Sequence, residues 1–562
     1  MVSIPSGLTL RALSLPISCH RIPWRRVSTA ATGSDSLKPY YITTPIFYPN
    51  SVPHIGHLYS LVVGDTFARY NQIRHPKRPV HFVNGTDEHG WKIQKAAEAK
   101  GMEPLAFCDQ LSIHFRELIR KADVNVTRFT RTTEKEHCEA VGHLWRQLDA
   151  QGLIYKGQHD GWYSISDECF YTETQITKVE TPAGTQVSET RYMSIETSSS
   201  VERLTEENYK FRLSQFREPL LAHYKRNPDT IFPASQYDVV MEMLSEPMSD
   251  LSISRPRARL RWGIPVPTDP EQTIYVWIDA LTTYLSSVGY PWSSGNGLAQ
   301  GWPPNLQVIG KDILRFHAIY LPAMLLALDM PLSHKLLSHA HWTVEHRKMS
   351  KSLGNVVDPI TAIDQYGIDV VRYYLARVGG RFKGDTSWDS EQLEKVSKEI
   401  ASLLGNLYLR ITSKSIQTRA LQGGDGTTLS SGAEGTGFEG VSQTLVDRLQ
   451  GLQEQVETNM DGMVVAEALE QITLVLREAN AVLTAVAPWA KSTPVQTVHD
   501  IHVLTLECLR VCGILLQPFM PGKSGELLNA LGVSTDRRSL ADAVFDVGRV
   551  ELDKVIPGVK LF

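Results

Sequence analysis

Hydrophobic and polar positions follow two periods in the first part of the chain. Tyr41 to Thr44 is a β-branched and aromatic run, which predicts a buried strand. Ile55 to about Ile73 carries apolar residues at helical spacing, and Pro79 to Asn84 predicts a second strand. This alternation over residues 38–150 is typical of a doubly wound α/β sheet.

The strand pattern returns later in the chain and then ends. Ile274 to Ala280 predicts a strand because Ile274, Val276 and Ile278 alternate, and further strands are expected before Gly310 and at Lys335 to His341. From about Glu391 only long helical patterns follow. One of them has an apolar stripe made of Leu393, Val396, Ile400, Leu403, Leu407 and Ile411. Residues 423–440 are rich in Gly, Ser and Thr and predict a flexible insertion between helices.

The composition of the chain mainly excludes certain classes of protein and site. A chain of 562 residues is expected to form two to four domains. Its net charge of −4 is not the strong basicity of a general nucleic-acid binder, so any RNA contact must come from local patches. The six cysteines form no C-x-x-C pair, which indicates neither a disulfide framework nor a zinc knuckle. No apolar run is long enough to cross a bilayer.

The first 34 residues have a different composition from the rest. They contain four arginines and no acidic residue, since Asp35 is the first. This bias is typical of a mitochondrial transit peptide, and the expected location is the mitochondrial matrix. The alternative is a disordered basic tail of a cytosolic protein.

The first chemically suggestive pattern lies where the strand at Tyr41 passes into the helix at Ile55. A helix start presents main-chain N–H groups and the positive end of its dipole, both of which favour an anion. His54 and His57 stand on one face of that helix, and Gly56 between them would let a ring or ribose approach. The pattern predicts a nucleotide phosphate site, and the alternative is two ordinary histidines.

A second pattern is the cationic segment Lys348-Met-Ser-Lys-Ser352. On its own it could be a solvated basic turn. Taken in order with His54-Ile-Gly-His57, it resembles the two signature motifs of class I aminoacyl-tRNA synthetases, and details elsewhere resemble the methionyl branch. The resemblance covers the chain from about Pro39 to the C-terminal region. It implies a Rossmann-like parallel sheet with a connective insertion, followed by an all-α anticodon-binding helical bundle.

The resemblance implies an ATP-dependent ligase that forms an aminoacyl-adenylate with the help of Mg²⁺ and transfers the amino acid to tRNA. The implied catalytic residues are His54, His57, Lys348 and Lys351. The implied ATP-binding set comprises His54, Gly56, His57, Gly310, Asp312, Lys348, Ser350 and Lys351.

The amino-acid pocket implied by the methionyl branch consists of Ile46, Tyr48, Asp87, Trp277, Ala280, Tyr284, Ile313 and His317. Aromatic and aliphatic walls suit a polarizable thioether, and Tyr and His could donate a weak hydrogen bond to its sulfur. Asp87 follows a strand and could hold an ammonium group; the alternative is a helix N-cap. The alternative for Trp277 is a core residue.

Residues 151–265 match the place of the connective insertion, where many methionyl enzymes bind zinc through C-x-x-C knuckles. Ser164 and Asp167 occupy positions where thiolates are expected, and one nearby cysteine, Cys169, cannot form a tetrahedral site. We therefore expect no zinc. The insertion is also short for an editing domain, so no editing is expected from it.

In the helical part, Asn406 and Arg410 and the Trp489 of an Ala-Pro-Trp turn resemble the residues with which methionyl enzymes grip the anticodon. Trp suits base stacking and Arg suits phosphate or base edges. The expected partners are a methionine tRNA, methionine and ATP, with no membrane, and a monomer is expected. The expected divisions are a transit peptide (1–34), two sheet halves (38–150 and 266–345), the insertion (151–265), the lysine loop with a stem-contact fold (346–390) and the anticodon domain (391–562).

Two rivals are a class I synthetase for another amino acid and a non-catalytic RNA-binding protein descended from a synthetase. The pocket residues and the short insertion argue against the first. The two histidines and two lysines argue against the second.

Overall fold

The computed structural model describes residues 38–179, 191–195, 197–293, 297–345, 347–349, 355–423 and 443–562. The predicted transit peptide, most of the 423–440 insertion, Ser350, Lys351 and Ser352 therefore lie outside the described residues. Within the described ranges, no helix combines the length and the apolar character that a membrane span requires.

A six-stranded parallel sheet positions the site. Its strands are arranged in the order β3 (Arg128–Arg131), β2 (Val80–Thr86), β1 (Tyr40–Thr43), β14 (Leu306–Gly310), β15 (Leu336–His339) and β9 (Ile231–Phe232). All five pairings are parallel. The chain runs from β1 to β2 on one side, while β14 lies on the other. This change of direction leaves a crevice at the carboxyl ends of β1 and β14, where ligands of such sheets bind.

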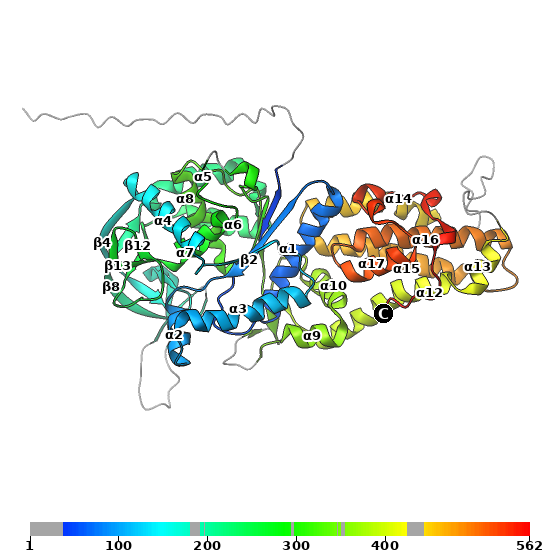
Figure 1. Ribbon diagram of the computed structural model, residues 1–562, viewed down its shortest axis with the longest axis horizontal. Coiled ribbons are helices and arrows are strands. Elements are labelled where there is room, and N and C mark those ends of the chain that lie inside the picture. Colours follow the sequence, from blue (N-terminus) through cyan, green and yellow to red (C-terminus); the bar gives the residue numbers. More distant parts are fainter. Residues whose placement is uncertain are drawn as a thin grey trace, which may run out of the picture. The chain divides into compact units, whose positions relative to one another are not determined.

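The strands are apolar runs because both faces of the sheet are covered. Tyr41 and Val83 pack into one hydrophobic cluster, whereas Ile42 and Phe82 pack into another. Successive side chains of a strand point to opposite faces, so each run serves two cores. Helix α1 (Ile55–Arg74) packs over β1, β2 and β14 on one side (Figure 1).

The helices that connect these strands are α2 (Trp91–Ala99), α3 (Pro104–Lys121), α4 (Lys135–Ala150), α7 (Val276–Ser286) and α8 (Leu321–Ala327). The strand predicted over Ile274 to Ala280 is wrong beyond its first residue. Strand β13 (Asp269–Ile274) ends there, and Val276 begins α7. Every residue from Val276 to Leu285 is buried, and a short helix buried on all sides is not readily distinguished from a buried strand by its period.

The inserted region between α4 and α7 is built on long antiparallel strands. Strand β4 (Ile154–Ser164) pairs with β8 (Ser200–Phe211), and β5 (Cys169–Tyr171), β6 (Ile176–Val179), β7 (Arg191–Ser194) and β10 (Leu251–Ser252) complete that sheet. The chain then forms α5 (Arg217–Arg226), β9, α6 (Ala234–Ser245) and a small sheet of β11 (Ser254–Pro256), β13 and β12 (Pro265–Val266). Strand β9 lies inside the range expected for the insertion but pairs with β15 of the main sheet.

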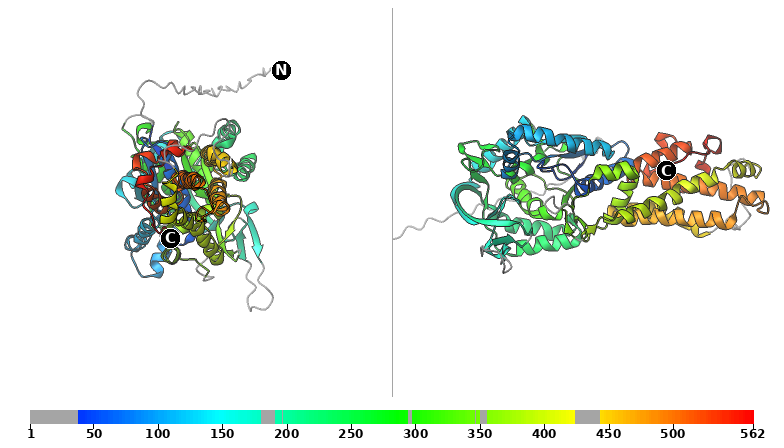
Figure 2. Two further views of the ribbon diagram at one scale, coloured as in Figure 1. Left: turned by 90° about the vertical axis from the view of Figure 1, so that its right-hand side faces the viewer. Right: turned by 90° about the horizontal axis from the view of Figure 1, so that it is seen from below.

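After β15, strands β16 (Trp342–Val344), β17 (Arg347–Lys348) and β18 (Thr386–Ser387) form a three-stranded sheet, and α9 (Pro359–Tyr366) and α10 (Ile368–Gly379) follow the lysine segment. The helical part contains α11 (Ser390–Ile400), α12 (Leu407–Ile411), α13 (Lys414–Ala420), α14 (Gln443–Asp461), α15 (Val465–Val486), α16 (Val495–Leu516) and α17 (Pro521–Ala530). Helices α14, α15 and α16 run side by side (Figures 1 and 2).

The predicted apolar stripe holds except at one position. Residues Ala401–Asn406 form a π-helical segment between α11 and α12. This wider turn shifts the helix face, so that Leu404 is buried and Leu403 is only half-buried. Asn406 is the last residue of this segment.

A buried ion pair joins α1, the helix that begins after His54, to the helical part of the chain. Arg372 of α10 lies 2.6 Å from Asp65 of α1, and both side chains are fully buried. The same guanidinium donates to the carbonyls of Pro518 and Phe519, just before α17. A buried charge is tolerated when it is paired and hydrogen-bonded, as here.

Candidate active site

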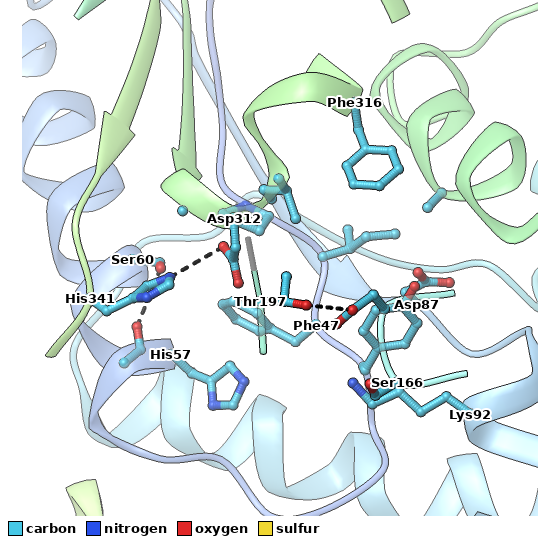
Figure 3. Close-up of a pocket in the computed structure, with 18 of the residues that line it drawn as sticks. Phe47, His57, Ser60, Asp87, Lys92, Ser166, Thr197, Asp312, Phe316 and His341 are labelled. Atoms are coloured by element: carbon cyan, nitrogen blue, oxygen red, sulfur yellow. Dashed lines mark hydrogen bonds and ion pairs between the residues drawn. The ribbon is translucent and has the colours of Figure 1, made fainter. Parts of the chain in front are cut away.

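The carboxyl ends of the central strands open into one cavity of about 1130 Å³. This exceeds the usual size of a small-molecule site and can accommodate a nucleotide together with an amino acid. The predicted residues that line it are Ile46, Tyr48, His54, Gly56, His57, Asp87, Trp277, Ala280, Tyr284, Gly310, Asp312, Ile313 and His317. Figure 3 shows His57 and Asp312 toward one end of this space and Asp87 and Lys92 toward the other.

The two histidines form the start of α1. His54 is the N-cap residue, and its Nδ1 accepts the main-chain N–H of Gly56 at 3.1 Å. The Nδ1 of His57 accepts the main-chain N–H of His54 at 3.0 Å. A ring nitrogen that accepts carries no proton, so both imidazoles carry theirs on Nε2. Each ring therefore presents a neutral N–H donor.

Gly56 lines the cavity and also makes room for a neighbouring side chain. A Cβ atom there would lie 2.9 Å from the His54 ring. The glycine therefore leaves room for the imidazole. His57 in turn packs edge-on against Phe47 and Phe115, with ring centroids 4.7 and 5.3 Å apart.

Near the histidines, the Asp312 carboxylate lies 3.3 Å from His341 Nε2, and Ser60 Oγ lies 2.8 Å from His339 Nε2. His339 is the last residue of β15, and His341 follows two residues later. Sequence reasoning did not select these two histidines. Their position at the carboxyl end of a predicted strand was the available signal.

Asp87 lies at the other end of the cavity, away from His57 and Asp312. Its side chain is 2% exposed, and Oδ1 has no hydrogen-bond partner among the described residues. Burial raises the pKa of Asp87 well above its usual range, and the nearby Asp279 carboxylate adds to this. Asp87 is not a helix cap, because α2 begins after Gly90. The orphaned carboxylate oxygen is suited to an ammonium group.

Aromatic rings line the same cavity as Asp87. Trp277 stacks on Phe316 with ring centroids 3.7 Å apart and an interplanar angle of 12°, and Tyr48 meets Trp277 edge-on. Trp277 is the second residue of α7 rather than a strand residue. Such walls bind a polarizable side chain by contact.

Tyr284 and His317 are linked to each other. His317 Nδ1–H donates to the Ile313 carbonyl at 2.9 Å, and Nε2 accepts the Tyr284 hydroxyl at 2.7 Å. Burial lowers the pKa of His317 to about 4, so the ring is neutral near pH 7. The His317 Nδ1 proton and the Tyr284 hydroxyl proton are thus both donated to protein atoms, whereas the sequence predicts a weak hydrogen bond from these residues to a ligand sulfur.

The lysine segment continues from the small three-stranded sheet. Lys348 belongs to β17, which pairs antiparallel with β16, and its neighbours Arg347 and Met349 line the cavity. Ser350 and Lys351 are beyond the described residues. Three or more metal-binding side chains do not cluster anywhere in the described part of the chain.

A second candidate site lies at Trp489, which is 48% exposed. The Arg410 guanidinium lies over its ring, 5.0 Å from the centroid, and also donates to Thr484. Asn406 is exposed one turn before Arg410. Arg419, which sequence reasoning missed, donates to the carbonyls of Pro488, Ala490 and Thr493 and so fixes the turn that presents Trp489.

This parallel sheet, with the start of α1 and the buried Asp87 at one cavity, is the arrangement that the resemblance to a class I aminoacyl-tRNA synthetase implies. The family model described as "tRNA synthetases class I (M)" matches residues 40–412, and "Anticodon binding domain of methionyl tRNA ligase" matches residues 433–553. The chain belongs to the methionyl-tRNA synthetase family.

Named relatives agree over nearly the whole chain. A "Probable methionine--tRNA ligase, mitochondrial" of Neurospora crassa is 43% identical over 94% of this chain and 85% of its own length. The "Methionine--tRNA ligase, mitochondrial" of Homo sapiens is 42% identical over 90% of this chain and 86% of its own. The Mycobacterium tuberculosis methionyl-tRNA synthetase in complex with methionyl-adenylate is 35% identical, with a TM-score of 0.83 over 93% of this chain and 99% of that one.

One prediction concerns pH. Only the carboxylate form of Asp87 can pair with an ammonium, and the raised pKa of Asp87 increases its protonated fraction as the pH falls. The KM for methionine is therefore expected to fall as the pH rises, until the amino group of methionine itself loses its proton. Burial holds the pKa values of His317 and His339 at about 4, so neither contributes near neutrality. A pH profile of ATP–pyrophosphate exchange measures this, and a KM for methionine that rises with pH would contradict it.

Proposed function

We propose that this chain is the methionine–tRNA ligase of the mitochondrial matrix. It activates methionine with ATP to methionyl-adenylate and transfers the methionyl group to the 3′ end of tRNA(Met). The observation that carries this proposal is the buried Asp87 carboxylate, whose Oδ1 accepts no hydrogen bond from the described residues, in the same cavity as Trp277, His54 and His57. The word "mitochondrial" in the names of the relatives and the arginine-rich first 34 residues support the location.

In the first step, Asp87 holds the methionine ammonium while Trp277 and Phe316 contact its side chain. The methionine carboxylate oxygen attacks the α-phosphorus, and the bond from that phosphorus to the bridging oxygen breaks as pyrophosphate leaves. Such a transfer needs positioning and charge stabilisation rather than a covalent nucleophile. The Nε2–H groups of His54 and His57 donate to the phosphate oxygens.

The remaining residues of the nucleotide site bind the rest of ATP. Asp312 and Gly310 contact the ribose, and Lys348, Ser350 and Lys351 bind the departing pyrophosphate. Mg²⁺ would be carried by the phosphates themselves, as this ion commonly is, and would neutralise their charge. In the second step a ribose hydroxyl of the tRNA 3′ end attacks the methionyl carbonyl carbon, and AMP leaves.

We further propose that the chain acts as a monomer with the domain divisions predicted from its sequence, except that β9 of the 151–265 range belongs to the main sheet. Asn406, Arg410 and Trp489 contact the anticodon. The direct test of the whole proposal is charging of tRNA(Met) with radiolabelled methionine. Charging that requires both ATP and methionine is expected, and a purified, folded protein that charges no tRNA would overturn the proposal.

The Trp489→Ala variant is expected to separate the two steps. Loss of one stacked base is worth about 1–3 kcal/mol, so the KM for tRNA should rise about 5- to 150-fold. Methionine-dependent pyrophosphate exchange, which needs no tRNA, should be unchanged. Trp292→Ala, which removes another half-buried tryptophan in the catalytic half, serves as the matched control and should leave the KM for tRNA unchanged. Equal KM values for tRNA in the Trp489 variant and the parent would contradict the anticodon role.

A further inference from the structure

Two turns of the inserted region share two local features at their described residues. The turn after β4 reads Ser164-Ile-Ser-Asp-Glu168, and the turn after β7 reads Ser194-Ile-Glu-Thr-Ser198. In each, the hydroxyl of the first serine accepts the main-chain N–H three residues later, at 3.2 Å in both cases. In each, the fifth residue has a left-handed backbone, with φ of 55° at Glu168 and 58° at Ser198.

The two turns meet at the Asp167 carboxylate. Its Oδ2 accepts the hydroxyls of Thr197 at 2.6 Å and of Tyr171 at 3.0 Å, and its Oδ1 accepts the hydroxyl of Ser199 at 2.9 Å. Two facing turns with side chains at their first and fourth positions are an arrangement that can hold a tetrahedral zinc ion when those side chains are Cys or His.

The residues present here do not fit zinc. The first and fourth positions of the turns are Ser164, Asp167, Ser194 and Thr197. Structural zinc sites use thiolates and imidazoles, and neutral hydroxyls are poor substitutes for them. The one carboxylate already accepts three hydrogen bonds from the protein. Hydrogen bonds to a charged acceptor are the strong ones, so this centre joins the turns without a metal.

The Asp167 turn also contacts the amino-acid end of the cavity. The Trp277 Nε1–H points at the main-chain carbonyl of Asp167, 3.5 Å away. The Glu168 carboxylate accepts the main-chain N–H of Lys92 in the first turn of α2, as well as the Tyr163 hydroxyl at 2.9 Å. Figure 3 shows Ser166 and Thr197 of the two turns together with Asp87 and Lys92 around the same space.

We propose that Asp167 is a positioning residue for methionine recognition. Its hydrogen-bonded carboxylate takes the place of a metal ion and holds the two turns against Trp277 and the start of α2. Left-handed backbone at non-glycine residues persists only where the surroundings hold it, and the Asp167 hydrogen bonds supply that constraint. This inference rests on the proposed function of the cavity as a methionine site.

The test compares Asp167→Ala and Asp167→Asn with a matched control. The control is Asp160→Ala, which removes a carboxylate of β4 that accepts hydrogen bonds from Arg203 and Thr205. Asp160 is exposed and lies outside the cavity. The alanine variant is expected to raise the KM for methionine about tenfold or more, equivalent to about 1.4 kcal/mol of binding. The asparagine variant should give a smaller rise, because an amide oxygen still accepts. The KM for ATP and the kcat of exchange should stay within about twofold of the parent in all three variants.

Two outcomes, one for the Asp167→Ala variant and one for the parent, would overturn the inference. One is a folded Asp167→Ala variant whose KM for methionine equals that of the parent. The other is one tightly held zinc per chain in the purified parent, found by metal analysis, with activity lost on chelation. If the alanine variant does not fold, Thr197→Val and Ser199→Ala each remove one hydroxyl donor, and unchanged KM values for methionine in both would refute the proposal. A parent that shows no methionine-dependent exchange would instead refute the proposed function.

Discussion

Replacing Asp87 with asparagine is expected to lower kcat/KM for methionine activation by at least about 100-fold. Asp87 is buried, its Oδ1 has no hydrogen-bond partner among the described residues, and in the proposed function it pairs with the ammonium of methionine. Removing one member of a buried ion pair typically costs about 3–5 kcal/mol, because the other charge stays buried and unpaired. The loss should fall mainly on the KM for methionine. Pyrophosphate exchange as a function of methionine concentration measures it.

The comparison variant for Asp87 is Asp312→Asn, which changes the other acidic residue of the predicted set. Asp312 lies near His341 rather than among the aromatic rings, so its loss should raise the KM for ATP and not that for methionine. If both variants raised the same KM, the division of the cavity into a nucleotide end and an amino-acid end would be wrong.

The His57→Ala variant is expected to lower the rate of adenylate formation about 10²–10³-fold while methionine still binds. Loss of one preorganised donor to a developing negative charge typically has an effect of this size. His57 is held by a main-chain N–H on Nδ1, which directs its proton to Nε2. Single-turnover measurement of adenylate formation gives the rate, and equilibrium dialysis gives the methionine affinity.

The control for His57 is His114→Ala. His114 is an exposed residue of α3 and lies outside the cavity, so its replacement should leave both quantities unchanged. A His57 variant with the parental rate of adenylate formation would show that the start of α1 does not contact the reacting phosphate.

The main sheet was predictable because each of its strands can be recognised from the residues of that strand alone. Strands buried on both faces must be apolar runs, and Tyr41 and Ile42 illustrate how one run serves two cores. The ends of those runs were visible as polar residues, which is why Asp87 and Asp312 could be placed near one cavity from the sequence. The fold class predicted from these patterns and from the two motifs is confirmed by the family models and the solved relatives.

Two predictions were wrong because packing in the folded protein, and not the local residue pattern, determines the structure there. Val276 to Leu285 is buried on every side, so no exposed polar face revealed the period of helix α7. The alternation of Ile274, Val276 and Ile278 therefore predicted a strand. The π-helical segment before Leu407 moved Leu403 away from the buried face, and an ideal helical period cannot anticipate this shift.

The residues that sequence reasoning missed depend on partners distant in the chain. Arg419 matters because three carbonyls after α15 converge on it. Asp167 was noticed only as a position without a thiolate, whereas the structure gives it three hydroxyl donors from two turns. Neither feature has a signature within its own segment.

The proposed function requires that this crevice activate methionine and no other amino acid. ATP–pyrophosphate exchange with each of the twenty amino acids in turn measures this selectivity. Exchange is expected with methionine, and exchange near background with the others, including leucine and cysteine. Exchange driven best by another amino acid, or absent with all twenty in a folded protein, would contradict the proposed function.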